Sequence, residues 1–133
     1  MAASNRTNTR HCRPDRALDH VYLVRQCQGD LELAKELLGL FRVQSHEALA
    51  LLSGSAPPAL ESMANVAHKL RGSALAVGAA RVSSAASAIE ERALIACGQA
   101  RPDAGELEAL SLAIAMLEAE VLEATIEIDR FCG

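Results

Sequence analysis

Aromatic side chains are scarce in this chain of 133 residues, which holds one Tyr, two Phe and no Trp. Half of the residues are nevertheless apolar, and most of these are Ala and Leu. Strands favour β-branched and aromatic residues, whereas Ala and Leu are the best helix formers and allow helices to approach one another closely. The length suits one compact domain. The composition therefore predicts a single all-α domain.

Basic side chains are outnumbered by acidic ones, 13 against 17, which gives a net charge of −4 and a pI near 5.5. The chain thus lacks the basic footprint of nucleic-acid-binding proteins, and it has no aromatic pair on which bases could stack. It also lacks an uncharged apolar run of about eighteen residues and the apolar stretch of a secretory signal. We therefore expect a cytoplasmic protein with no nucleic-acid partner and no membrane attachment.

Cysteine spacing gives no sign of a metal site. Cys12, Cys27, Cys97 and Cys132 form no C-x-x-C pair, and no His stands where it would complete a zinc cluster. None of the four His belongs to the Glu-x-x-His pairs of di-metal bundles either. Because nothing directs the chain to an oxidising compartment, reduced thiols are favoured over disulfides.

The N-terminal residues have no apolar period. Residues 1–14 contain arginines but no acidic residue, which predicts a disordered tail ahead of one domain over residues 15–133. Asp15 stands where a helix N-cap is expected, and Leu18 begins a run of roughly helical spacing that ends at Gly29. This pattern predicts a short first helix.

Four longer helices are predicted after it. Asp30 is expected to cap the second, which ends at the breaker run 53–58, and the third extends from Ala59 to a C-cap at Gly78. The fourth spans residues 80–97. The fifth begins at a capping box formed by Asp103 and Glu106.

Each long helix carries an apolar stripe that it cannot bury alone. The predicted stripes include Leu33, Leu37, Leu40, Phe41, Ala48, Leu51 and Leu52 in the second helix, Leu60, Met63, Ala67, Leu70, Ala74 and Val77 in the third, and Leu107, Leu110, Ile114, Leu117, Val121, Ala124 and Ile128 in the fifth. An antiparallel up-down four-helix bundle buries all of them, with the short additional N-terminal helix covering one end.

His68 lies one position beyond the apolar seam of the third helix, and hence on a flank that water and partners can reach. Arg71 and Gly72 follow at helical spacing on the same strip. Glycine inside an exposed helix costs about 1 kcal/mol relative to Ala. A glycine one turn from the imidazole would let another protein's active site approach it, although single glycines inside helices are also tolerated without a function.

The sequence around His68 resembles the signature of histidine-containing phosphotransfer (HPt) domains of two-component phosphorelays. Residues 67–74 read AHKLRGSA and residues 77–79 read VGA. In the family pattern His is followed by two residues, Lys, Gly and usually Ser or Ala, with a second Gly six residues after the first. The resemblance extends over about residues 15–130.

The match is residue by residue, with one departure. His68, Gly72, Ser73 and Gly78 keep the family spacing, whereas Arg71 stands where the family usually has Lys. The resemblance implies that His68 accepts a phosphoryl group from a receiver-domain aspartate or a kinase and passes it to another receiver aspartate. An exposed imidazole is largely neutral near neutral pH, so the nucleophile needs no separate general base. Arg71 would stabilise the phosphate oxygens with its guanidinium fork.

A carboxylate on the fourth helix is implied to orient the imidazole. Glu90 is at the position where several family members carry a Glu or Gln that bonds the second ring nitrogen. Its neighbour Glu91 is the alternative, and the inward position of Ile89 favours Glu90. A solvated surface glutamate without a role also fits the sequence.

Helical spacing also delimits a surface around His68 for transient partners. The expected partner-binding residues are Ala64, Asn65, Lys69, Gly72 and Leu75. The resemblance implies that the partners are receiver domains of response regulators and a (hybrid) histidine kinase. Each helix has one narrow apolar stripe, which the bundle itself buries, so we expect a monomer.

The sequence has no loop for ATP phosphates and no acidic cluster ahead of a strand that would hold Mg²⁺. We therefore expect a phosphocarrier without autokinase activity and with no bound cofactor, Mg²⁺ being supplied by the partner receiver domain. A four-helix adaptor that binds a receiver or kinase without being phosphorylated is the alternative. Met1 and the short tail favour a free-standing protein over a module of a larger hybrid kinase.

Overall fold

The computed structural model describes residues 13–54 and 59–133, which form five helices and no strand. The helices are α2 (His20–Gln26), α3 (Leu31–Ser53), α4 (Leu60–Val77), α5 (Ala80–Cys97) and α6 (Ala104–Cys132). The all-α prediction is confirmed for these residues. The predicted tail lies outside them except for Arg13 and Pro14, as does most of the connection after α3.

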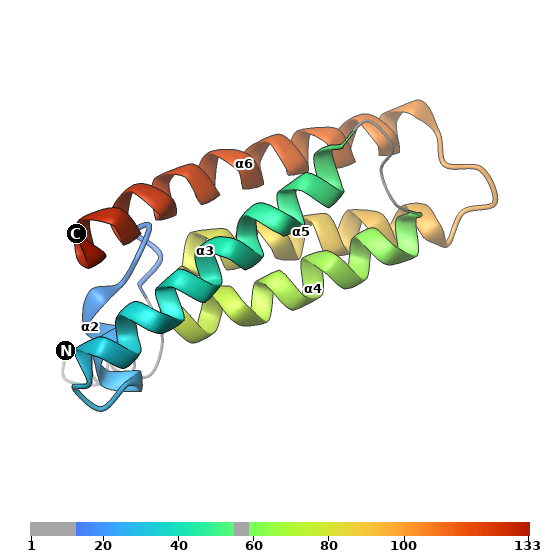
Figure 1. Cartoon of the computed structure of the whole chain (residues 1–133). Coiled ribbons are helices and arrows are strands. Elements are labelled where there is room, and N and C mark those ends of the chain that lie inside the picture. The colour runs from blue at the N-terminus through green and yellow to red at the C-terminus, as the bar shows by residue number, and fades with distance from the viewer. Residues whose placement is uncertain (1–12, 55–58) are drawn as a thin grey trace, which may run out of the picture.

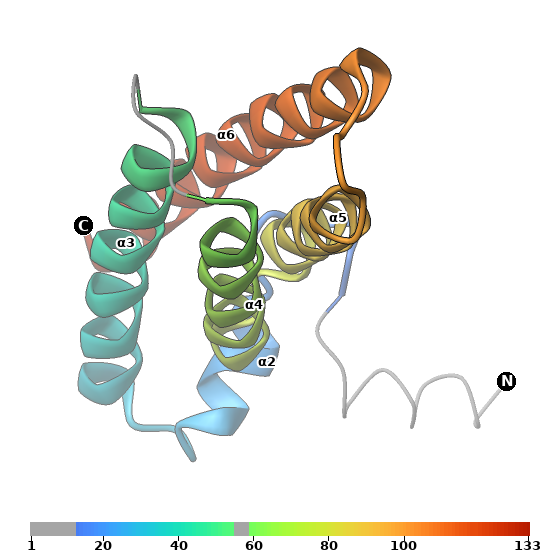
Figure 2. The same cartoon turned by 90° about the vertical axis from the view of Figure 1, so that its right-hand side faces the viewer.

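The four long helices pack in a ring. Each contacts the next along the chain, and α3 also contacts α6. The colours of Figure 1 show that consecutive long helices run in opposite directions. In the end view of Figure 2, α4 and α6 lie on opposite sides with α3 and α5 between them. The outer faces of α4 and α6 therefore point away from each other.

The buried faces of α4 and α5 both contain small side chains. Ala67 and Ala74 of α4 and Ala86 and Ala93 of α5 are completely buried. The distance between packed helices depends on the side chains at their contact, so alanines allow a close approach. This packing fixes the backbone of α4 relative to α5.

The core face of α3 is rotated from the predicted stripe. Its buried residues are Ala34, Leu38, Phe41, Ser45, Ala48 and Leu52. The prediction is wrong for Leu33, Leu40 and Leu51, which are exposed, as is Leu107 in α6. Two apolar stripes interleave on α3, and periodicity alone does not tell which one meets the neighbouring helices. Buried Ser45 is satisfied because its hydroxyl donates to a backbone carbonyl of the preceding turn.

Three of the predicted helix ends are confirmed. Asp30 accepts from the N–H of Leu33 at 3.1 Å, and Asp103 accepts from the N–H of Glu106 at 2.7 Å. Gly78 ends α4 in the left-handed conformation. The capping box at Asp103 is only half formed, since Oε2 of Glu106 is buried without a hydrogen-bond partner among the described residues.

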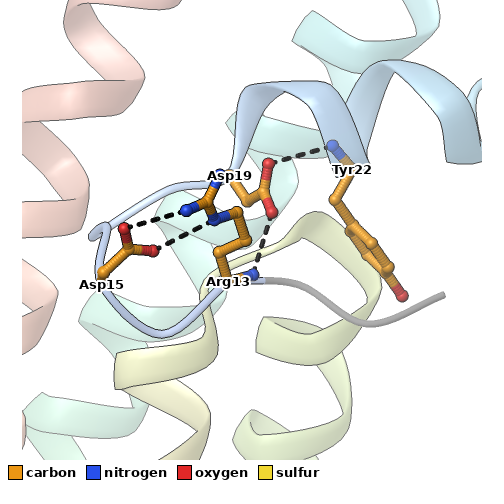
Figure 3. A network of polar contacts seen from close by, with 4 residues as sticks. All are labelled: Arg13, Asp15, Asp19 and Tyr22. Carbon is orange, nitrogen blue, oxygen red and sulfur yellow. Dashed lines mark hydrogen bonds and ion pairs between the residues drawn. The ribbon is translucent and has the colours of Figure 1, made fainter. Parts of the chain in front are cut away.

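The prediction that Asp15 caps the first helix is wrong. The N-cap of α2 is Asp19, whose Oδ1 accepts from the N–H of Tyr22 at 3.1 Å and whose Oδ2 accepts from the N–H of Arg13 at 2.9 Å (Figure 3). Asp15 instead lies beside the Arg13 guanidinium, with Nε 3.4 Å from Oδ1. Buried Asp19 satisfies donors on both sides, which fixes the entry of the chain into α2.

The turn between α4 and α5 is fastened to α2. The N–H of Asp19 donates to the carbonyl of Gly78 at 2.9 Å. Gly78 has φ +85°, and a Cβ at this position would lie 2.9 Å from the carbonyl oxygen of Asp19. Only glycine accommodates both the backbone conformation and the close approach.

The remaining features concern the cysteines and membrane crossing. Cys27 is buried, Cys97 and Cys132 are exposed, and all three are free thiols, whereas Cys12 lies outside the described residues. None of the helices described above combines the length and apolarity that a membrane crossing requires.

Candidate functional site

His68 lies in the middle of α4, directly after Ala67 of the buried face. The side chain is 58% exposed. Its backbone is held by the contacts of α4 with both α3 and α5. The structure thus presents a solvent-accessible imidazole on a firmly packed helix.

Glu90 of α5 joins His68 and Arg71 into one polar cluster. Oε2 of Glu90 lies 2.9 Å from Nδ1 of His68, and Oε1 lies 3.4 Å from Nη1 of Arg71. The Glu90 side chain is 19% exposed, far less than that of His68. Each carboxylate oxygen therefore faces a different neighbour, and the carboxylate is largely shielded from water.

The position of the proton on His68 follows from these contacts. Nη2 of Arg71 also lies 3.2 Å from Nδ1. A guanidinium only donates and a carboxylate only accepts, so Nδ1 cannot bond both in one tautomer. The contact with Glu90 is shorter, so we assign Nδ1–H as its donor. Nε2 then carries the free lone pair, and none of the described residues hydrogen-bonds to it.

The choice between Glu90 and Glu91 is made by the position of α5 beside α4. Ile89 is fully buried, and Glu90 follows it on the side of α5 that faces His68. Glu91 is exposed to solvent. The sequence placed both carboxylates on the correct helix, and helix packing selects Glu90.

A comparison with protein families identifies the family of this chain. The family model for the Hpt domain matches residues 36–120, which include His68, Arg71 and Glu90. The chain belongs to the Hpt domain family. The resemblance inferred from the motif at His68 is thereby confirmed. Hpt domains carry out histidine phosphotransfer in phosphorelays and interact with receiver domains and kinases. Searches among curated proteins and among solved structures found no match.

Four of the five residues expected at the partner surface of this Hpt domain are exposed, namely Asn65, Lys69, Gly72 and Leu75. The expectation for Ala64 is wrong, because this residue is 3% exposed and belongs to the core. The buried face of α4 is wider than one seam, since α4 packs against α3 on one side and α5 on the other. Ala64 therefore has no surface to offer a partner.

Lys69 lies on the side of α4 that faces α3. Together with Gln44, Glu47 and Leu51 of α3 it lines an open groove of about 520 Å³. Sequence reasoning missed this groove because it assigned Leu51 to the core. Leu94 of α5, one turn after Glu90, is also exposed and was also missed.

Gly72 lies one turn after His68 and is exposed. A Cβ at this position would meet no heavy atom within 4 Å. The packing of the Hpt domain itself therefore does not require glycine here, although glycine weakens the helix by about 1 kcal/mol relative to Ala. A requirement from outside the chain, such as close approach of a partner, explains the residue better.

Metal ligands are not gathered anywhere in residues 13–54 and 59–133. These segments hold no group of three or more His, Cys, Asp or Glu side chains that could bind a metal ion. Glu90, the carboxylate closest to His68, is occupied by His68 and Arg71.

Proposed function

We propose that this Hpt domain relays a phosphoryl group through His68 between receiver-domain aspartates of a two-component phosphorelay. The observation that carries the proposal is the bond from Nδ1–H to Glu90, which leaves Nε2 free on an exposed imidazole. The antiparallel up-down arrangement of α3 to α6 provides the rigid support.

The transfer uses the lone pair of Nε2. This nitrogen attacks the phosphorus of a partner's phosphoaspartate, so that a P–N bond forms as the P–O bond to the aspartate breaks. The aspartate leaves as a carboxylate. The phosphorylated imidazole is then cationic and keeps its proton on Nδ1, where the negative charge of Glu90 stabilises it. In the onward step a receiver carboxylate attacks the phosphorus, and His68 leaves as neutral imidazole.

Arg71 is proposed to stabilise the phosphoryl oxygens. Its guanidinium is half-buried and lies beside both Glu90 and the imidazole. The anchored fork retains donors that can reach oxygens on the phosphorylated ring. Arginine thus supplies the positive charge that lysine usually supplies in the family.

The partner provides the other half of the reaction. We propose that a receiver domain brings the aspartate together with its Mg²⁺, and that the Hpt domain holds no cofactor and has no autokinase activity. Asn65, Gly72 and Leu75 would contact the receiver around His68, with Lys69 at the edge. A small interface with an apolar centre suits a partner that must dissociate after transfer. A histidine kinase would contact the same surface, and the Hpt domain would act as a monomer.

The test is transfer of labelled phosphate from a panel of receiver phosphoaspartates and kinase phosphohistidines. The wild type should become labelled, and the label should be acid-labile and alkali-stable. His68→Gln should abolish labelling. His46→Gln is the matched control, because His46 is also exposed on a long helix and its Nδ1 also faces an acceptor, the carbonyl of Arg42, at 2.8 Å.

Labelling that survives in His68→Gln would refute the assignment of the phosphoacceptor. If partners bind the wild type but no donor labels it, the protein is an adaptor and the relay proposal fails.

A further inference from the structure

The long helix α6 carries a second apolar stripe on the face opposite its core stripe. Leu112, Met116, Leu122 and Ile126 are 63%, 59%, 62% and 40% exposed. Exposed Ala115 and Ala119 lie between them. We call these six residues the outer stripe.

The outer stripe follows the pattern of a helix that packs against another helix. Leu112, Ala115, Ala119, Leu122 and Ile126 alternate at spacings of three and four residues, as a and d positions do in a coiled coil. The core stripe of α6 occupies the intervening positions. Isolated exposed leucines are ordinary in soluble proteins, but a continuous stripe is a feature of interaction sites. A helix with two apolar faces is expected to be covered on both.

A groove next to the outer stripe extends this surface onto α5. It has a volume of about 250 Å³. Its lining consists of Arg81, Ser84, Ala85, Ala88, Ala113, Met116 and Glu120. The small residues of α5 lower the surface beside Met116, so a helix laid along α6 could insert a side chain there.

The charges of α6 determine what kind of helix would fit. The helix holds seven acidic residues and a single basic one, Arg130. Glu118 and Glu123 flank the outer stripe at the positions that face the flanks of a partner helix. Both are exposed. The charge of Glu120 is balanced by Arg81 of α5, whose Nη2 lies 2.9 Å from Oε1 of Glu120. The two groups form an ion pair, but their geometry is not that of a hydrogen bond.

A second copy of α6 would not complement this surface. In a parallel pair Glu118 would face Glu123 of the other helix, and in an antiparallel pair each would face its own counterpart. Both arrangements bring like charges together at the edge of an apolar contact, which disfavours association.

We propose that the outer stripe of α6 binds an amphipathic helix of a partner protein whose apolar stripe is flanked by Lys and Arg. The surface is separate from the His68 site, since α6 contacts α3 and α5 but not α4 within the described residues. The end view of Figure 2 shows α6 across the bundle from α4. A partner bound to α6 thus leaves His68 accessible to a receiver domain, and the proposal does not depend on phosphotransfer.

The experiment uses the full chain and two labelled synthetic helical peptides. Both have three heptads with Leu at the a and d positions, and one carries Lys and the other Glu at e and g. Fluorescence anisotropy should show that the Lys peptide binds about tenfold or more tightly than the Glu peptide. Leu122→Glu should weaken binding of the Lys peptide by a similar factor. Leu40→Glu, at an equally exposed leucine of α3, should leave it unchanged.

A charge exchange makes the test specific. The double variant Glu118→Lys/Glu123→Lys should reverse the preference, so that the Glu peptide binds more tightly. An unchanged circular dichroism spectrum of each variant would establish that the domain is folded, so this test stays separate from the proposed function.

Three results would overturn the proposal: equal binding of the two peptides, no binding of either at about millimolar concentration, or equal losses in Leu40→Glu and Leu122→Glu. Sedimentation showing a dimer of the wild type that Leu122→Glu disrupts would also overturn it, because the occupant would then be a second copy.

Discussion

Nδ1 of His68 lies 2.9 Å from Oε2 of Glu90, a residue 22 positions further along the chain. The imidazole is largely exposed while the carboxylate is largely covered, so the bond has one end in water and the other in the packed interface of α4 and α5. Such a bond holds the ring in one orientation without hiding Nε2. The predictions below follow from this contact and from its surroundings.

Removing the carboxylate should slow phosphotransfer. Glu90→Ala deletes the acceptor of Nδ1–H, and loss of a hydrogen bond worth about 1–1.5 kcal/mol corresponds to about a tenfold lower rate. Glu90→Gln retains an acceptor oxygen and should keep most of the activity. Single-turnover transfer from a phosphorylated receiver measures both rates. Glu91→Ala is the control, and an equal loss there would contradict the assignment of Glu90.

The tautomer gives an independent readout of the same contact. In the wild type, nitrogen NMR of labelled histidine should show the proton of neutral His68 mainly on Nδ1. In Glu90→Ala the population should shift toward Nε2–H, the commoner tautomer of a free imidazole. A spectrum that does not change between the two proteins would mean that Glu90 does not hold the proton.

Arg71 should contribute through its charge. Arg71→Ala is expected to lower the transfer rate about three- to tenfold, less than a buried charge would, because the guanidinium is partly exposed and water screens it. Arg71→Lys should lose less, since the charge remains while the fork is lost. Comparison with Arg92→Ala, which removes an exposed arginine of α5, separates the local effect from the change in net charge. If Arg71→Ala and Arg71→Lys transfer phosphate as fast as Arg92→Ala does, Arg71 has no role in transfer.

Gly72 and Gly39 form a matched pair. Both lie inside long helices, and a Cβ at either would meet nothing within 4 Å. Replacement by Ala should raise the free energy of unfolding by about 1 kcal/mol in each case. Only Gly72→Ala should also slow transfer from a receiver, because only Gly72 lies beside His68. Denaturant unfolding and transfer rates on both variants check this, and equal transfer rates would remove the argument for close approach at Gly72.

Gly78 should be far less tolerant than Gly98. Gly78→Ala forces an L side chain to φ +85° and brings a Cβ to 2.9 Å from the backbone of Asp19, so we expect a loss of stability of about 2 kcal/mol. Gly98 has φ −74° and ordinary contacts of 3.6 Å, so Gly98→Ala should change stability little. Urea denaturation compares the two. Similar urea midpoints for the two variants would contradict this prediction and would show that α2 moves to accommodate the added methyl group.

The local features of the fold were readable from the sequence. As helix caps, Asp30, Asp103 and Gly78 act within a turn of their own position, so spacing along the chain suffices to predict that role. The neighbourhood of His68 and Arg71 is likewise local, because residues three apart on a helix lie side by side. At α2 the same reasoning failed, since two acidic residues precede the helix and only Asp19 meets the donors of both Arg13 and Tyr22.

The sequence by itself determined the helical class, the ends of the long helices and the phosphotransfer motif, because propensity, capping and helical spacing act over a few residues. Tertiary structure decided which faces are covered. It buried Ala64, left Leu40 and Leu122 in solvent, and turned Glu90 rather than Glu91 toward His68. Those outcomes depend on how each helix is rotated against its neighbours, and that rotation is set by packing of the whole bundle rather than by any single stripe.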